Sequence, residues 1–346
     1  MWANDSAIMA EVLDEKSELE IAINGSAITR YVLPLPVAYF VMTLKVILVI
    51  LVISANLFML TVFCMRKKVR EYPQGVFMVS MTVADFLQGI AVMPFGVETT
   101  LTNTWPYGKV MCDVTATALT VSFAVSLCSM CLMSVDRHLE IRYNINYHQI
   151  MTQKRAVALV LILWGSCIVG LSTVIIGFVG GFYNRKTEQC VPAYIPRGLP
   201  AMFLVHFGYQ VVAYLIIICV NVANLMIARR HLKMIAQQVQ NLQHNEDAGG
   251  SVKKSMRGLK TVSIMVGVLI VCWTPLIVAK LYIFATRSYV NCGITVWIAY
   301  SNSFFNTVIY SRRTAVFRAE MERMKLILRG VFSRNQVNVE STTSST

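Results

Sequence analysis

The chain has 346 residues, a formal net charge of +13 at pH 7, 56% hydrophobic residues and only 14% charged residues. Soluble globular domains carry about 25% charged residues, so this composition excludes an ordinary soluble domain and indicates a membrane protein. The basic residues are spread over the loops between apolar runs, which argues against a nucleic-acid-binding protein and favours contact with anionic lipid and a cytosolic partner.

Apolar runs long enough to cross a lipid bilayer recur along the chain. A membrane-spanning helix needs about 20 mostly apolar residues. We expect seven such helices, at 35–64, 75–98, 110–135, 155–179, 200–227, 259–285 and 293–311. The predicted fold class is therefore all-α, a seven-transmembrane helix bundle. The polar, Gly-rich stretch 237–251 is predicted to be a flexible loop between the fifth and sixth helices.

The distribution of Lys and Arg predicts how the chain is oriented. These residues cluster in alternate loops and in the C-terminal segment, and basic residues favour the cytoplasmic side of short loops. We therefore expect an extracellular N-terminus and a cytoplasmic C-terminus. Sequons at Asn4 and Asn24 fit glycosylation of an extracellular segment. Residues 1–30 lack a basic start followed by an apolar core, so no cleaved signal peptide is expected.

Two cysteines fall on the side predicted to be extracellular. Cys112 begins the third apolar run, and Cys190 lies in the loop between the fourth and fifth runs. A disulfide between them would tie this loop onto the end of the third helix. Arg137 follows Cys112 by 25 residues, or about 38 Å of helix. Asp136 and Arg137 would therefore lie at the opposite, cytoplasmic end of the same helix.

A set of ordered motifs carries a resemblance to a known family. The motifs are Asn56 in the first run, TVADFLQG around Asp85 in the second, Asp136-Arg137 ending the third, Trp164 in the fourth, CWTP at 272–275 and NTVIY at 306–310. In this order and spacing, the chain resembles a rhodopsin-family (class A) G protein-coupled receptor over nearly its whole length.

The resemblance implies a domain plan and a set of partners. The expected parts are an extracellular segment 1–34, a seven-transmembrane receptor domain 35–313, a short amphipathic eighth helix 314–330 on the cytoplasmic side and a disordered cytoplasmic tail 331–346. Such a receptor would be a multi-pass protein of the plasma membrane. It would bind an extracellular small-molecule ligand in the outer half of the bundle and activate a heterotrimeric G protein inside. The hydroxyl-rich tail also fits receptor kinases and arrestin as partners.

The resemblance places a G protein switch at the cytoplasmic end of the third helix. Asp136 would hold Arg137 in the resting state and release it on activation. Ile145 would enter a pocket of the G protein, and Tyr310 would complete the switch. The alternative for Arg137 is an arginine that merely reaches the membrane interface, as is common at helix ends.

A polar cluster is expected near the middle of the membrane. An acid deep in a membrane span is costly unless it has a partner. The resemblance implies that Asp85, with Ser126, Asn302 and Asn306, surrounds an allosteric sodium ion. The alternative is a purely structural hydrogen-bonded network. No other metal site and no other cofactor is predicted.

The ligand class is indicated by two motifs and by one departure from them. VMPF at 92–95 and WPYGKVMCD at 105–113 resemble the biogenic-amine branch. Leu119, however, stands where amine receptors carry the Asp that pairs with the ligand ammonium. We therefore predict an amine-receptor-like protein without that counter-ion. An adenosine- or lipid-receptor-like protein is the alternative.

The side chains expected around the ligand lie in the outer half of the bundle. They are Glu98, Thr115, Leu119, Ser122, His206, Trp273, Ile277, Lys280 and Tyr300. Lys45 and Lys280 are expected to extend to the membrane interface, as long cationic side chains near helix ends do, rather than pair with an acidic ligand. Tyr300 stands where an opsin needs its Schiff-base lysine, so retinal is not expected.

Several positions depart from the family pattern. His138 replaces the usual Tyr after Asp-Arg, Asn221 replaces a Tyr of the fifth span, and Thr307 replaces the Pro of the seventh-span motif. Trp273 and Pro275 keep the expected aromatic side chain and helix kink of the sixth span. Reduced or constitutive signalling is the hypothesis that follows from these changes.

Two other classes of function were weighed against a receptor. A transporter or channel should show internal repeats or several charges within its spans, and Asp85 is the one acid deep in a predicted span. An enzyme should show a metal or nucleophile motif, and the sequence has no HExxH or GxSxG. Cys128 and Cys131 lie within an apolar run and are interpreted as small buried hydrophobic residues. We therefore expect no catalytic residues.

Overall fold

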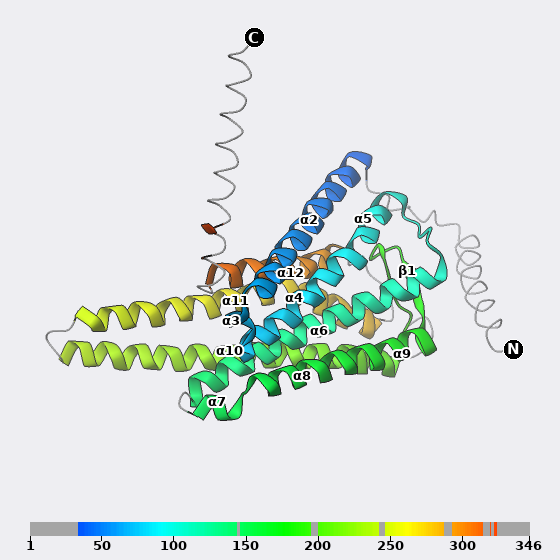
Figure 1. The fold of residues 1–346 in the computed structure, drawn as a ribbon. Coiled ribbons are helices and arrows are strands. Elements are labelled where there is room, and N and C mark those ends of the chain that lie inside the picture. Colours follow the sequence, from blue (N-terminus) through cyan, green and yellow to red (C-terminus); the bar gives the residue numbers. More distant parts are fainter. Residues whose placement is uncertain are drawn as a thin grey trace, which may run out of the picture. The chain divides into compact units, whose positions relative to one another are not determined.

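The computed structural model describes residues 34–143, 146–194, 200–241, 246–286 and 293–313, together with 319 and 322–323. Almost all of these residues are helical (Figure 1), which confirms the all-α prediction. The chain divides into two compact units, Met1–Val41 and Met42–Thr346. Of the first unit the structure describes the first turns of helix α2, and all the other elements belong to the second.

The first part of the chain forms three long helical segments. They are built from α2 (Leu35–Met65), the short α3 (Lys67–Arg70), α4 (Pro73–Ala91), α5 (Met93–Thr102) and α6 (Gly108–Tyr143). The second segment is interrupted at Val92, whose φ of −126° and ψ of −54° are not helical. Pro94 follows in the first turn of α5, where its missing N–H is tolerated. The predicted second run is thus one span made of two helices.

The fourth span and the loop after it contain the irregular parts of the fold. The short α7 (Tyr147–Ile150) precedes the span, which comprises α8 (Gln153–Gly165), the π-helical turns Ser166–Leu171 and Ile175–Val179, and α9 (Ser172–Val174) between these turns. A β-hairpin follows, in which β1 (Gly181–Asn184) pairs antiparallel with β2 (Gln189–Pro192). The sequence carries no strong β pattern here, and this hairpin was not predicted.

The last three helices are α10 (Pro200–Asn241), α11 (Glu246–Thr286) and α12 (Gly293–Arg313). Helices α10 and α11 run side by side (Figure 1) and extend into the stretch 237–251, where a flexible loop was predicted. That prediction was wrong on both sides of residues 242–245, because Gln, Ala and Glu favour helix and no Pro stops it. Pro275 lies inside α11 without ending it.

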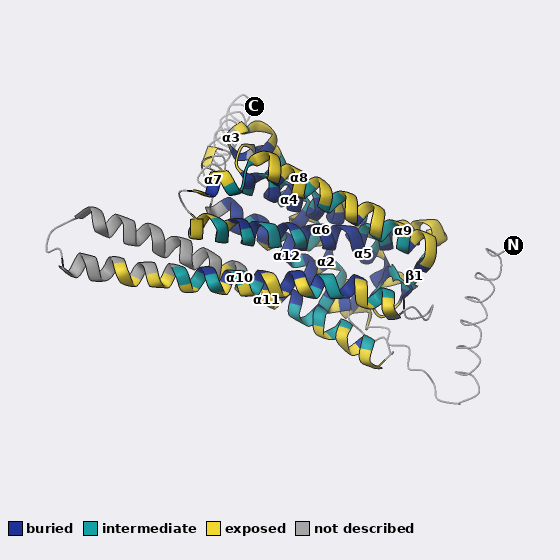
Figure 2. Ribbon diagram, turned by 90° about the horizontal axis from the view of Figure 1, so that it is seen from below, coloured by how far each residue is buried: buried dark blue, intermediate teal, exposed yellow. Residues whose placement is uncertain are grey.

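Six of the described helical segments are long and apolar enough to cross a membrane. They are Leu35–Met65, Pro73–Thr102, Gly108–Tyr143, Gln153–Val179, Ala201–Ile227 and Val266–Thr286. The seventh predicted span is present as α12, which carries more polar residues. Figure 2 shows exposed residues along α8, and among them Leu161 and Ile162 have relative exposures of 66% and 67%. Exposed apolar side chains of this size suit a lipid surrounding.

Helix α6 is the centre of the packing. It contacts α4, α10 and both hairpin strands. The main apolar core includes Phe123, whose ring centroid lies 5.2 Å from that of Trp273 and 5.3 Å from that of Tyr300. This aromatic group joins α6 to α11 and α12. The predicted segment 1–34, almost all of the eighth helix 314–330 and the tail 331–346 lie outside the described residues, as do both sequons.

Candidate functional site

The two ends of α6 carry different groups. The end that holds Cys112 is called the disulfide end below, and the end that holds Asp136 and Arg137 is called the Arg137 end. A disulfide joins Cys112 to Cys190 of β2, which confirms that prediction. The hairpin lies so close to α6 that a Cβ on Gly181 would be 2.8 Å from the carbonyl oxygen of Cys112. Only glycine fits there without displacing backbone.

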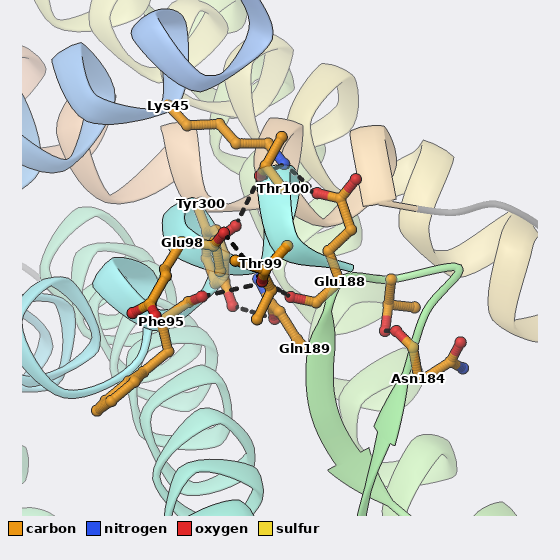
Figure 3. A network of polar contacts seen from close by, with 12 residues as sticks. Lys45, Phe95, Glu98, Thr99, Thr100, Asn184, Glu188, Gln189 and Tyr300 are labelled. Carbon is orange, nitrogen blue, oxygen red and sulfur yellow. Dashed lines mark hydrogen bonds and ion pairs between the residues drawn. The ribbon is translucent and has the colours of Figure 1, made fainter. Parts of the chain in front are cut away.

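The turn of the hairpin contacts the bundle at the disulfide end (Figure 3). Glu188 forms an ion pair with Lys45 of α2. The Lys45 ammonium also donates to the hydroxyl oxygen of Thr100 at 2.7 Å and lies 5.0 Å from the ring centroid of Trp297. Lys45 is only 7% exposed. The expectation that it extends to the membrane interface was therefore wrong, because its partners lie inside the bundle.

Two more hydrogen bonds hold the same turn. The Thr99 hydroxyl donates to the backbone carbonyl of Glu188 at 2.6 Å, and the Tyr300 hydroxyl donates to the Gln189 side-chain oxygen at 2.6 Å (Figure 3). Tyr300 is fully buried. Sequence reasoning missed Glu188 and Gln189 altogether. The available signal was Lys45 itself, a cation within an apolar run that needs a partner.

The side chains predicted to surround a ligand fall into separate groups. Trp273 and Tyr300 pack on Phe123, as described above. His206 lies 3.3 Å from Gln210, which accepts a hydrogen bond of 3.1 Å from Lys280. The others are Thr115, Leu119 and Ser122, buried on α6, the half-buried Ile277 on α11, and Glu98, which is exposed on α5. Glu98 accepts a hydrogen bond from Tyr107. The structure therefore does not gather Glu98 with the other predicted residues.

The Asp85 cluster links three helices. One carboxylate oxygen of Asp85 accepts hydrogen bonds from Ser126 of α6 at 2.7 Å and Ser303 of α12 at 2.9 Å. Ser126 was predicted to lie here and Ser303 was missed. Asn306 lies near the same carboxylate, but its amide nitrogen forms no hydrogen bond of good geometry with the described residues. Asn302 is buried in α12.

The side-chain oxygen atoms of this cluster are of the kinds that coordinate a hard cation such as sodium. Within the described part of the chain, the second carboxylate oxygen of Asp85 and the side-chain oxygen of Asn302 are buried without a hydrogen-bond partner. Carboxylate, amide and hydroxyl oxygens are the ligands that hard cations prefer. The residues that would hold a sodium ion are Asp85, Asn302, Ser126 and Ser303. Among described residues no group of three His, Cys, Asp or Glu side chains could hold another metal.

The Arg137 end differs from the expected switch. The buried carboxylate of Asp136 accepts a hydrogen bond of 2.7 Å from Tyr147, and the Arg137 Nε atom lies 3.8 Å from Glu140. Neighbouring side chains on a helix point in different directions, whereas residues three apart lie on one face. Burial and the Asp136 carboxylate raise the pKa of Tyr147, so its hydroxyl remains a donor. Tyr310 is buried, and Ile145 lies outside the described residues.

Two further hydrogen bonds connect α6 to α10 at this end. The His138 Nδ1 atom lies 2.8 Å from the side-chain oxygen of Asn224, so the tautomer with a proton on Nδ1 donates this bond. The Asn221 amide donates to the Ser134 hydroxyl at 2.9 Å. His138 and Asn221 are two of the positions that depart from the family pattern. Both departures therefore take part in one neutral connection between the helices.

Comparison with known proteins agrees with this geometry. The family model described as "7 transmembrane receptor (rhodopsin family)" matches residues 55–310. G-protein coupled receptor 52 of Mus musculus is 26% identical over 298 residues, covering 83% of this chain and 81% of that protein. Trace amine-associated receptor 5 of Mus musculus is 27% identical, covering 92% of this chain and 93% of that protein.

A third relative is the Octopamine receptor beta-1R of Drosophila melanogaster, 24% identical over 75% of this chain and 56% of that protein. The family model covers most of the chain and includes the Asp85 cluster, the disulfide and the Arg137 end. These relatives are receptors, in agreement with the prediction that the chain is not an enzyme. The chain belongs to the rhodopsin family of seven-transmembrane receptors and is a multi-pass membrane protein.

Proposed function

We propose that the chain is a G protein-coupled receptor of the plasma membrane. An extracellular small molecule binds near the disulfide end, and a heterotrimeric G protein binds at the Arg137 end. The observation that carries this proposal is the path between the two ends. The rings of Phe123, Trp273 and Tyr300 link α6 to α11 and α12, and Asp85 bonds α6 and α12 closer to the Arg137 end.

Each part of this path has a physical role. A ligand that moves Tyr300 or Trp273 would shift α12 or α11 relative to α6. Pro275 removes a backbone hydrogen bond from α11 and makes that helix easier to bend. Movement of α12 would lengthen the hydrogen bond from Ser303 to Asp85. A sodium ion bound there would add positive charge that opposes such rearrangement.

The ligands named for the relatives suit this chain only in part. Octopamine and trace amines appear in the names of two relatives. In this chain Leu119 is buried and apolar where an acid would pair with an ammonium. We therefore infer a receptor related to the amine branch that does not bind a simple amine through that position. Receptor kinases and arrestin are proposed as further partners through the hydroxyl-rich tail 340–346.

Nucleotide exchange on purified G proteins tests this function. The full chain in lipid nanodiscs is compared with Arg137→Ala and Asp85→Asn, in the presence of amines, nucleosides, lipids and peptides. We expect exchange to fall at least tenfold in Arg137→Ala, because the exposed guanidinium at the helix end is lost. Arg142→Ala removes a charge from the same helix end and should keep most of the exchange. Equal exchange by both arginine variants would contradict the proposal.

A further inference from the structure

The groups around the Lys45–Glu188 ion pair come from three separate helices. Lys45 lies on α2, Thr100 on α5 and Trp297 on α12. The Lys45 ammonium has three hydrogens to direct: it pairs with Glu188, donates to Thr100 at 2.7 Å and lies 5.0 Å from the Trp297 ring. The Thr100 hydroxyl oxygen is 3.2 Å from the same Glu188 oxygen. A cation and a hydroxyl thus converge on one carboxylate, and an aromatic ring packs on the cation.

The carboxylate of Glu188 can leave this site while the hairpin stays attached. The backbone carbonyl of Glu188 is held separately by Thr99, and the side chain of Gln189 is held by Tyr300. Cys190 is tied covalently to α6. The Glu188 side chain is 18% exposed, so water reaches it. Rotation of one side chain is therefore enough to free Lys45.

The backbone conformation of Glu188 does not depend on where its carboxylate lies. Its φ of +56° lies in the left-handed region, which residues with a Cβ rarely adopt. Rotation of the side chain leaves this φ unchanged, and the hydrogen bond from Thr99 continues to hold the backbone. Lys45, in contrast, lies within a membrane-spanning helix and is 7% exposed, so leaving its charge without an anion is costly. The site therefore requires a carboxylate, but nothing requires that it come from Glu188.

We propose that Lys45, Thr100 and Trp297 form a carboxylate-binding site that the chain fills with its own Glu188. A small molecule that carries a carboxylate competes with Glu188 for this site. The inference deepens the proposed receptor function by naming a ligand class. It also explains how a receptor with Leu119 in place of an acid can recognise a charged ligand. The ligand charge that this site recognises is negative, and its counter-ion, Lys45, lies on α2 rather than on α6.

Rescue of a cavity variant by a free carboxylate tests the site. The full chain carrying Glu188→Ala is purified in detergent, and its melting temperature is followed with sodium propionate at constant ionic strength. We expect a melting temperature below that of the unmodified chain and a saturable rise of about 2–4 °C with propionate. Propionamide has the same shape without the charge and should produce no rise. Glu188→Gly, which suits the positive φ at this position and leaves the same space open, replaces Glu188→Ala if the latter is not recovered.

Two control variants locate the effect. Lys45→Met combined with Glu188→Ala removes both charges and should lose the response to propionate. Glu98→Ala removes an exposed acid of α5 and should respond no more than the unmodified chain. An equal rise with and without Lys45, or no rise in Glu188→Ala and Glu188→Gly, would overturn the proposal. No G protein enters this measurement, so its outcome does not depend on whether the chain activates one.

Discussion

The two ends of helix α6 are held by interactions of different strength. At the disulfide end a covalent bond joins Cys112 to Cys190, and a buried ion pair joins Lys45 to Glu188. At the Arg137 end the connections between segments, among the described residues, are hydrogen bonds such as those between Tyr147 and Asp136 and between His138 and Asn224. Removing one partner of a buried ion pair costs several kcal/mol, whereas a neutral hydrogen bond contributes about 1 kcal/mol. One end is therefore fixed, and the other can rearrange at small cost.

This difference in strength suits a protein that transmits a conformational change from the disulfide end to the Arg137 end, across the membrane. The covalent bond and the anchored hairpin keep α6 and the loop in a constant arrangement while single side chains exchange partners. At the other end, α6 and α10 are joined by weak, neutral contacts that a partner protein can replace. Variants that weaken each end in turn can test whether the interactions rank in this order.

The largest effect is expected from removal of the disulfide. Cys112→Ser with Cys190→Ser removes a bond that spans 78 residues, and the chain should lose about 2–5 kcal/mol in free energy of unfolding. Thermal unfolding of the purified protein in detergent measures the loss, and a reducing agent should destabilise the unmodified chain similarly. Cys219→Ser, at an exposed free cysteine, should be neutral. A double variant as stable as this control would show that the disulfide end is not the fixed end.

The next largest effect is expected at Asp136. Tyr147→Phe removes the hydrogen bond to a buried carboxylate, and bonds to charged groups contribute about 1.5–3 kcal/mol. The variant should unfold at a lower temperature and show higher basal nucleotide exchange, because α6 loses its hold on α7. Tyr143→Phe changes an exposed tyrosine at the end of α6 and serves as the control. Unchanged exchange in both variants would separate the Asp136–Tyr147 bond from the proposed switch.

The sequence was sufficient to predict the features that depend on local pattern. Long apolar runs fixed the positions of the spans, because a bilayer accepts few other structures. The pair Cys112 and Cys190 could be predicted because both lie on one side of the membrane. Ser126 could be assigned to the Asp85 cluster through the family motifs. The first two inferences needed only the spacing of residues along the chain, and the third needed the resemblance to the family.

The contacts that were missed depend on which side chains meet across the bundle. Lys45 and Glu188 are separated by 143 positions in the sequence, and nothing in either neighbourhood specifies the other. The hairpin brings them together, and its short strands follow a Gly-rich span end without a strong β pattern. Asp136 was expected to pair with the adjacent Arg137, but the helix directs the two side chains apart. Partner choice is a property of the packed structure.

The smallest effects should come from the neutral link between α6 and α10. His138→Phe, Asn224→Leu and the double variant form a cycle in which the free energy of unfolding and basal nucleotide exchange are measured. We expect a coupling free energy of about 0.5–1.5 kcal/mol and faster basal exchange in each single variant. The physical reason is that His138→Phe leaves the buried Asn224 side-chain oxygen without its partner, and Asn224→Leu does the same to the half-buried His138.

The exposed pair between Arg137 and Glu140 provides the comparison for this cycle. Its atoms are 3.8 Å apart and both side chains are about half exposed, so Glu140→Gln should change stability by about 0.5 kcal/mol or less. If Glu140→Gln alters basal exchange more than the His138 and Asn224 variants do, the charge pair controls the Arg137 end. The reverse order would show that the replacement of the family's Tyr by His138 moved this control from a charged contact to a neutral one. In that case the strength of basal signalling is set by how tightly α10 is held to α6.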